Sequence, residues 1–427
     1  MFSQQGLSLD QAPPISVVFR FFFSGSLFGI LAGIALFFYG REAYDPSSSA
    51  AVTLTHILTL GVMLSFMFAS LFQMLPVIAG VTLTSPVKKA NWVQYPLIIG
   101  TVMLLAAFNY HHSWLYSVAS LLLAVTLLSI VYLMLQNLGR IQNHTDSSRG
   151  MMIALISFTL LVLLALYLTG TLGGHFEGNY YLQVKEAHYS LGLFGWITLL
   201  IIAISFQVIE MFYVTPPYPI LLSKYLTKAI LLTLLADFAA GLFAPQNAIL
   251  LKVLLVIELI TYAIVTLLRL SQRKRPIADA TVWFWRLGMS SLIISMTGMF
   301  AGLFINVQWI TTLSIIFFTT FALSIVFGMF YKIIPFLTWF HLNSQGYFTA
   351  PMMHEVIHPR TAKKHFWIHA AALSASLLSI VIPQAIYLVA GLLMLSFGWM
   401  SYQIIHAHLL YKKTQREGEK FDMEVAS

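Results

Sequence analysis

The sequence is dominated by apolar segments long enough to cross a lipid bilayer as helices. Crossing about 30 Å of hydrocarbon at 1.5 Å per residue takes about 20 residues of α-helix. Of the 427 residues 59% are hydrophobic and only 9% are charged, whereas a soluble protein carries roughly 25% charged residues. We therefore predict an all-α, polytopic integral membrane protein with about twelve transmembrane helices. The segments lie at about 17–39, 52–78, 93–110, 115–136, 151–171, 188–213, 226–243, 246–269, 283–305, 308–334, 366–384 and 386–409.

The cationic residues give this plan an orientation, because loops retained in the cytoplasm are enriched in Lys and Arg. Every second predicted loop carries them, and the loops between are nearly bare, with Arg41, Lys185 and Lys252 as exceptions. We therefore expect both termini on the cytoplasmic side of a bacterial inner (plasma) membrane. The cations that set this alternation are Lys88, Lys89, Arg140, Arg149, Lys224, Lys228, Arg273, Lys274, Arg275, Arg360, Lys363 and Lys364, followed by Lys412, Lys413, Arg416 and Lys420 in the tail.

The chain reads as a single transmembrane domain over residues 1–427, in contact with the lipid bilayer. Its only substantial loop is expected at about 341–365 and a short tail at 411–427, both cytoplasmic. The net charge of +8 is spread over short loops and orients the protein in the membrane, so we expect no nucleic-acid partner. Cysteine is absent, which excludes disulfides, thiolate metal sites and a cysteine nucleophile.

Two of the thirteen histidines are expected at the same depth in the membrane. His56 and His188 stand near the beginnings of the second and sixth helices, which both run from outside to inside. Two imidazoles at one depth on neighbouring helices can supply the opposed axial nitrogens of a haem. A histidine at a helix start is also often an interfacial group that water or a carbonyl satisfies.

The segments after these histidines share a pattern. His56 begins His-Ile-Leu-Thr-Leu-Gly and its helix closes with Phe72-Gln73, while His188 begins His-Tyr-Ser-Leu-Gly and Phe206-Gln207 follows. The tenth helix ends similarly at Gly328, Met329 and Pro335 but has no histidine. This pattern indicates a degenerate internal repeat.

At these residues the sequence resembles subunit I of the haem–copper oxidases and their diverged relatives, including NnrS-type haem- and copper-containing membrane proteins. The resemblance covers the twelve-helix plan, His56 followed by Leu75-Pro76, and Ala322-Leu323-Ser324 through Phe327-Gly328 to Pro335-Phe336. It implies an oxidase-like bundle in which His56 is a haem ligand, and His188 is the best remaining second ligand of a haem b.

The sequence departs from that family where dioxygen would be reduced. The paired histidines of the family's seventh helix have no counterpart between Thr227 and Phe243, and its tenth-helix pair falls near Leu313 and Ile315. The resemblance therefore implies a haem-dependent membrane protein in electron transfer, nitric-oxide or metal stress response, or respiratory assembly, with a redox partner or another membrane subunit, and not a complete oxygen reductase. If it is an enzyme, it would be a haem-dependent oxidoreductase.

Two further histidine groups are candidate metal sites. Copper takes imidazole ligands, and His111, His112 and His175 lie in outer loops near the expected level of the histidine pair; the alternative is that they are solvated. The predicted loop contains His354-Glu355-Val356-Ile357-His358, which matches the zinc-protease pattern. Pro359 would interrupt the helix that this pattern requires, so we favour a metal-binding or solvated loop over a protease.

Acidic residues inside predicted helices supply a second class of function. Glu210, Asp237 and Glu258 fall in the sixth, seventh and eighth helices, where a carboxyl group is costly and often functional. They are candidates for a proton path, and the alternative function is a proton-coupled secondary transporter. Each can equally pair with Lys252 or with buried backbone.

Overall fold

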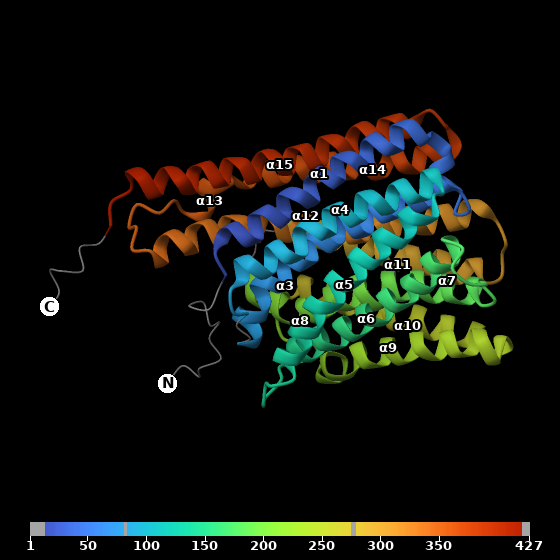
Figure 1. Ribbon diagram of the computed structural model, residues 1–427. Helices are drawn as coiled ribbons and strands as arrows, with labels where there is room; N and C mark the ends of the chain where they lie inside the picture. The colour runs from blue at the N-terminus through green and yellow to red at the C-terminus, as the bar shows by residue number, and fades with distance from the viewer. Residues whose placement is uncertain (1–12, 81–82, 275–278, 421–427) are drawn as a thin grey trace.

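The chain folds into a bundle of long helices (Figure 1). The computed structural model describes residues 13–80, 83–274 and 279–420, and these residues form helices and loops without a β-strand. Ten helices or continuous helix runs in these ranges are long and apolar enough to cross a membrane, so the protein is an all-α, multi-pass membrane protein. They are α1 (Ile15–Tyr39) with η2 (Gly40–Tyr44), the run of α2 (Ser49–His56), η3 (Ile57–Met63) and α3 (Leu64–Ala79), α4 (Pro86–Tyr110), α5 (Ser113–Leu138), α6 (Asp146–Leu172), the run of α7 (Tyr181–Ser190), η4 (Leu191–Thr198) and α8 (Leu199–Tyr213), α9 (Ile220–Phe243), η5 (Pro245–Asn247) with α10 (Ala248–Ser271), α12 (Gln308–Ser344) and α15 (Ala385–Glu417).

Two further long helices complete the twelve segments predicted from the sequence. These are α11 (Ala280–Gly302) and α14 (Pro359–Val381), each of 23 residues. They fall outside the group of ten because polar and cationic side chains, such as Lys363 and Lys364 in α14, lower their mean hydropathy. The remaining helix, α13 (Met353–Val356), is a single turn between α12 and α14.

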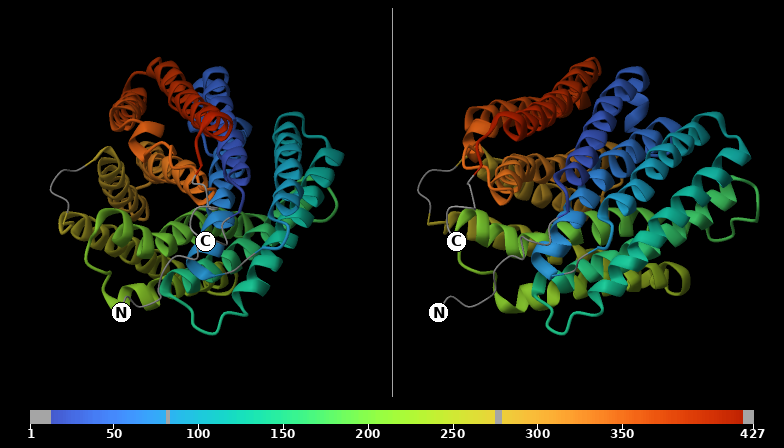
Figure 2. Two further views of the ribbon diagram at one scale, coloured as in Figure 1. Left: turned by 90° about the vertical axis from the view of Figure 1, so that its left-hand side faces the viewer. Right: turned by 60° about the vertical axis from the view of Figure 1, so that its left-hand side comes forward.

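Helices α1 and α15 lie side by side and antiparallel, so the described parts of both chain ends lie at the same end of the bundle (Figures 1 and 2). Glycines allow this close packing: a Cβ on Gly29 would lie 2.1 Å from Phe397 Cγ, and one on Gly33 would lie 2.8 Å from the carbonyl oxygen of Ala390. A buried hydrogen bond of 2.7 Å joins the hydroxyls of Ser26 and Ser401 across the same interface. Small residues that bring backbones together, with a hydrogen bond between them, are typical of helix packing in membranes.

Several helix starts are fixed by polar side chains that satisfy free backbone N–H groups. Ser48 accepts from the backbone N–H of Ala51 at the start of α2, and Thr145 accepts from that of Ser148 at the start of α6. Asp279 accepts from Thr281 and Val282 at the start of α11. Such caps close the first turn of a helix that would otherwise expose unpaired donors.

The predicted loop at 341–365 is shorter than expected, because the helices on both sides extend into it. Helix α12 continues past Pro335 to Ser344, and α14 begins at Pro359. His365 therefore lies in a helix, where it is fully buried. The predicted tail also begins as helix, since α15 continues to Glu417.

The two histidine-bearing helix runs share an unusual construction. In the first, α2 ends at His56 and is followed at once by the π-helical segment η3. In the second, α7 continues for two residues past His188 to Ser190, and the π-helical segment η4 follows at Leu191. A π turn inserts an extra residue into an α-helix and occurs frequently at functional sites. Both runs therefore have the same order of α, π and α segments, at the two places where the sequence shows a similar pattern. Helix α12 contains no π-helical segment.

Candidate functional site

His56 and His188 lie at matching positions in their helices, and their rings lie close together. Each is the eighth residue of its helix, counted from Ser49 in α2 and from Tyr181 in α7. Their ring centroids are 6.3 Å apart, and their ring planes are nearly parallel, at 15°. The structure thus brings together the two histidines that the sequence placed at a common depth.

Backbone carbonyls orient both rings. His56 Nδ1 lies 2.8 Å from the carbonyl oxygen of Val52, and His188 Nδ1 lies 3.4 Å from that of Leu161 in α6. Since a carbonyl can only accept, each Nδ1 carries the proton, which leaves the lone pair of a neutral imidazole on Nε2. A histidine that donates from one nitrogen to a carbonyl and presents the other is the usual arrangement of a metal ligand.

The spacing of the rings suits two ligands of one metal ion. Two imidazole nitrogens at about 2 Å from a shared metal put the ring centroids about 6 Å apart, because a ring nitrogen lies about 1.1 Å from its centroid. The observed 6.3 Å agrees with this value. Both side chains are only half-buried, although they lie inside the bundle. Two histidines at this distance are a donor set that could hold a metal such as a haem iron.

The neighbouring residues hold α2 in place through apolar and polar contacts. The ring of Phe108 in α4 lies 4.8 Å from that of His56. Thr53 lies one turn before His56, and its Oγ1 accepts from the side-chain amide of Asn109 at 3.0 Å. Asn109 also accepts from the Tyr39 hydroxyl at 2.7 Å. This side-chain amide ties α1, α2 and α4 together beside the histidine pair.

The three outer histidines weighed as copper ligands make separate contacts. His175 Nε2 lies 2.5 Å from Ser117 Oγ, His111 Nδ1 lies 3.5 Å from the Tyr116 hydroxyl, and His112 is exposed at the start of α5. Among the described residues no group of three or more His, Cys, Asp or Glu side chains is placed to hold a metal ion. The expected three-imidazole group is therefore not assembled in this structure.

The zinc-protease pattern is not formed on a helix. Helix α13 ends at Val356, Ile357 is extended, and His358 precedes α14, where its Nδ1 accepts from the backbone N–H of Arg360. Glu355 accepts from the backbone N–H of Met352. The two histidines therefore do not share one helical turn, as the proline at 359 predicted.

The three intramembrane carboxyl groups lie on three helices with different neighbours. Glu210 in α8 accepts from the backbone N–H of Tyr218 at 3.2 Å. Asp237 in α9 lies in a small pocket with the ion pair of Lys252 and Glu186. Glu258 in α10 accepts from Thr233 at 3.1 Å, and within the described ranges its Oε2 has no partner.

The structure contains a second buried histidine cluster that the sequence pattern did not predict. His365 and His369 lie one turn apart on α14, where the first has its Nδ1 2.9 Å from the Tyr331 hydroxyl and the second has its Nε2 2.8 Å from Ser324 Oγ. Both are buried. The spacing of four residues would have placed them on one helix face, but the nearby cations suggested a loop.

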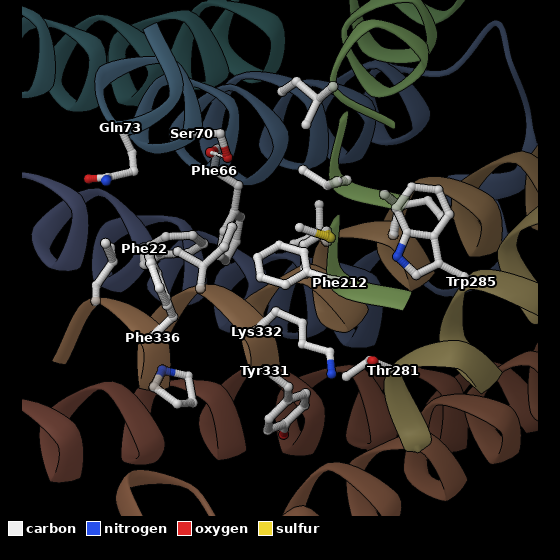
Figure 3. Close-up of a pocket in the computed structure, with 18 of the residues that line it drawn as sticks. Phe22, Phe66, Ser70, Gln73, Phe212, Thr281, Trp285, Tyr331, Lys332 and Phe336 are labelled. Atoms are coloured by element: carbon white, nitrogen blue, oxygen red, sulfur yellow. Dashed lines mark hydrogen bonds between the residues drawn. The ribbon is translucent and has the colours of Figure 1, made fainter. Parts of the chain in front are cut away.

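A cavity of about 470 Å³ lies among α3, α8, α11, α12 and the segment around α13, and Figure 3 shows its lining. Phe66 and Phe212 contribute to its apolar walls, and Ser70, Gln73 and Lys332 are among its polar groups. Its lining includes His354 of the predicted metal-binding pattern, but not the histidine pair or Glu258. The sequence pattern does not predict this cavity, because its walls come from helices that are far apart in the chain.

No model of a known protein family matches the chain, and no curated protein matches its sequence. The function is therefore argued from the geometry of the site.

Proposed function

We propose that this protein is a haem-binding membrane protein of the cytochrome oxidase subunit I-like type, with His56 and His188 as the two axial ligands of one haem b. The observation that carries the proposal is the 6.3 Å spacing of two nearly parallel imidazole rings whose Nδ1 atoms face backbone carbonyls. The absence of cysteine rules out covalent attachment of the haem through thioethers. The resemblance to oxidase subunit I, with both termini cytoplasmic in a bacterial inner membrane, belongs to the same proposal.

A haem held by these two residues would supply one-electron transfer, since its iron can be ferric or ferrous. His56 and His188 would hold the iron, and the carbonyls of Val52 and Leu161 would fix their tautomer and orientation. One role would be electron transfer with a redox partner or another membrane subunit. The other roles in this proposal are nitric-oxide or metal stress response and respiratory assembly. Complete dioxygen reduction is not proposed, because Leu313 and Ile315 stand where the tenth-helix histidines of the oxidases would fall.

The test is a reduced-minus-oxidised absorption spectrum of the full-length protein, purified from cells supplied with haem. We expect a haem b spectrum that is lost in both His56→Ala and His188→Ala. His112→Ala is the matched control, because it removes an exposed histidine from a loop of the same side and leaves the pair intact. A colourless wild-type protein would remove the proposal, and loss of the spectrum in only one of the two variants would remove the pairing.

The alternative is a proton-coupled secondary transporter. The observation in its favour is Glu258, whose Oε2 is buried in a membrane helix without a partner among the described residues. An unpaired intramembrane carboxyl group is costly and is retained where protons or cations are handled. Glu258 and Asp237 lie on helices at the edge of the bundle, however, and neither lines the large cavity. The histidine geometry therefore favours the haem protein.

A further inference from the structure

Arg286 is a cation inside a membrane helix without a partner in the described part of the chain. It is the seventh residue of α11 and so lies about 9 Å along the helix axis from its first residue. None of the ion pairs or hydrogen bonds among the described residues involves its side chain. A charged side chain in a membrane segment is costly and often functional. The anion that would compensate Arg286 therefore has to come from outside these residues.

The guanidinium group of Arg286 can be reached from outside the bundle. Its side chain is half-buried, and none of its nitrogens is among the buried, unpartnered atoms of the described residues. Trp283 lies three residues earlier, so the two side chains are neighbours on the surface of α11. Side chains on a helix lean toward its N-terminus, so Arg286 extends back toward Trp283 and the end of the helix. This direction brings the cation to the membrane surface, where lipid headgroups lie.

Helix α14 adds a second cation and further aromatic rings beside Trp283. Lys363 Nζ lies 5.5 Å from the centre of the Trp283 ring. The rings of Phe366 and Trp367 lie 5.5 Å and 6.5 Å from the same ring. Lys363 and Trp367 are both exposed. Tryptophan is enriched at the level of the headgroups, so this cluster has the composition of a membrane interface.

No acidic side chain on either helix offsets these cations. The segments Ala280–Gly302 and Pro359–Val381 contain neither Asp nor Glu. Asp279, which caps α11, already forms an ion pair of 2.6 Å with Lys332. The surface around Trp283 is therefore positively charged beside exposed apolar side chains, which complements a molecule with an anionic headgroup and apolar chains. Basic pockets between membrane helices bind such lipid headgroups.

We propose that the surface around Trp283 binds one anionic phospholipid, whose phosphate accepts hydrogen bonds from Arg286 and lies near Lys363, and whose acyl chains pack against Trp367. Arginine suits this role, because its planar guanidinium group can donate to two phosphate oxygens at once. These four residues do not line the large cavity, and the site does not depend on haem.

Native mass spectrometry of the full-length protein, delipidated in detergent, counts bound lipids directly. Dioleoylphosphatidylglycerol is the probe, and dioleoylphosphatidylcholine is the competitor, because it has the same chains and no net charge. A cation near a membrane surface strengthens binding of an anionic lipid about fivefold. With two cations we expect one phosphatidylglycerol per chain to bind roughly 25-fold more tightly than phosphatidylcholine. Glycerol 3-phosphate, which has no acyl chains, should not displace it.

Substitutions of the two cations test the assigned contacts. Arg286→Gln and Lys363→Gln should each weaken binding of phosphatidylglycerol about fivefold and leave binding of phosphatidylcholine unchanged. Arg286→Lys keeps the charge and should retain most of the preference. Lys224→Gln is the matched control and should keep the full preference. Lys224 is the exposed fifth residue of α9, as Lys363 is of α14, and its Nζ lies 5.4 Å from the ring centre of Tyr225.

Three results would overturn the proposal. Equal affinity of the wild-type protein for the two lipids would show that the headgroup is not recognised. Displacement of phosphatidylglycerol by an equal concentration of glycerol 3-phosphate would show a site for a soluble phosphate. A loss in Arg286→Gln no greater than that in Lys224→Gln, with both proteins folded by their thermal unfolding curves, would show a general effect of surface charge.

Discussion

The substitution Gly29→Ala should destabilise the protein by separating α1 from α15. A Cβ at this position would lie 2.1 Å from Cγ and 2.3 Å from Cδ1 and Cδ2 of Phe397. Ordinary carbon contacts are about 3.5–4.0 Å, so the ring or the helices must move by more than about 1 Å. Phe397 is fully buried and its Cγ is next to the backbone, which leaves the ring little freedom to move away.

The net effect is the difference between two terms. Overpacking of a filled core costs about 1–3 kcal/mol. Replacing glycine by alanine inside a helix recovers up to about 1 kcal/mol. Because three ring atoms are in conflict, the overpacking cost should lie in the upper part of its range, about 2–3 kcal/mol. After the gain from alanine, we expect Gly29→Ala to lower the free energy of unfolding by about 1–2 kcal/mol.

Chemical denaturation in mixed micelles, followed by helical circular dichroism, measures this effect. Gly391→Ala on α15 is the matched control, because no atom lies within 4 Å of a Cβ built there and the substitution should be neutral or stabilising. Shortening the opposing side chain in Gly29→Ala/Phe397→Leu should recover part of the loss. A Gly29→Ala protein as stable as Gly391→Ala would refute the packing described for α1 and α15.

Two further predictions concern carboxyl groups. Burial alone would raise the pKa of Asp279, but Lys332 and hydrogen bonds from Thr281 and Val282 outweigh it and lower this pKa below its ordinary value. The folded state therefore favours the carboxylate, so its contribution to stability is present above about pH 4 and is lost as the pH falls further. Asp279→Asn, which keeps a helix-capping side chain, should show a smaller loss of thermal stability between pH 5 and pH 3; an unchanged pH profile would contradict this. Glu258→Gln should leave the haem b spectrum and the fold intact in the haem account, whereas loss of proton-coupled uptake in liposomes would favour the transporter.

The sequence predicted the helices well because hydropathy and length alone decide whether a segment can span a bilayer. It also predicted the common depth of His56 and His188, since depth follows from the position of a residue in its span. Which way the rings face depends on the rotation of each helix, and the π turns of η3 and η4 that affect this rotation have no simple sequence signature. The pairing at 6.3 Å therefore needed the structure.

Other features depended on contacts between distant segments. Gln73 and Lys332 meet the same cavity only because α3 and α12 pack in the same region of the bundle. His365 was assigned to a loop because cations precede it, yet Pro359 starts a helix that carries it into the core. Near a membrane surface, cations mark the end of an apolar segment but not the end of a helix.

The most direct test of the proposed function is the ligation state of the iron in the purified full-length protein. Two axial histidines predict one haem b per chain with a low-spin spectrum in both oxidation states. They also predict no spectral change when the reduced protein is exposed to carbon monoxide, because no axial position is open. A protein without haem, or a high-spin haem that binds carbon monoxide at once, would contradict the assignment of His56 and His188.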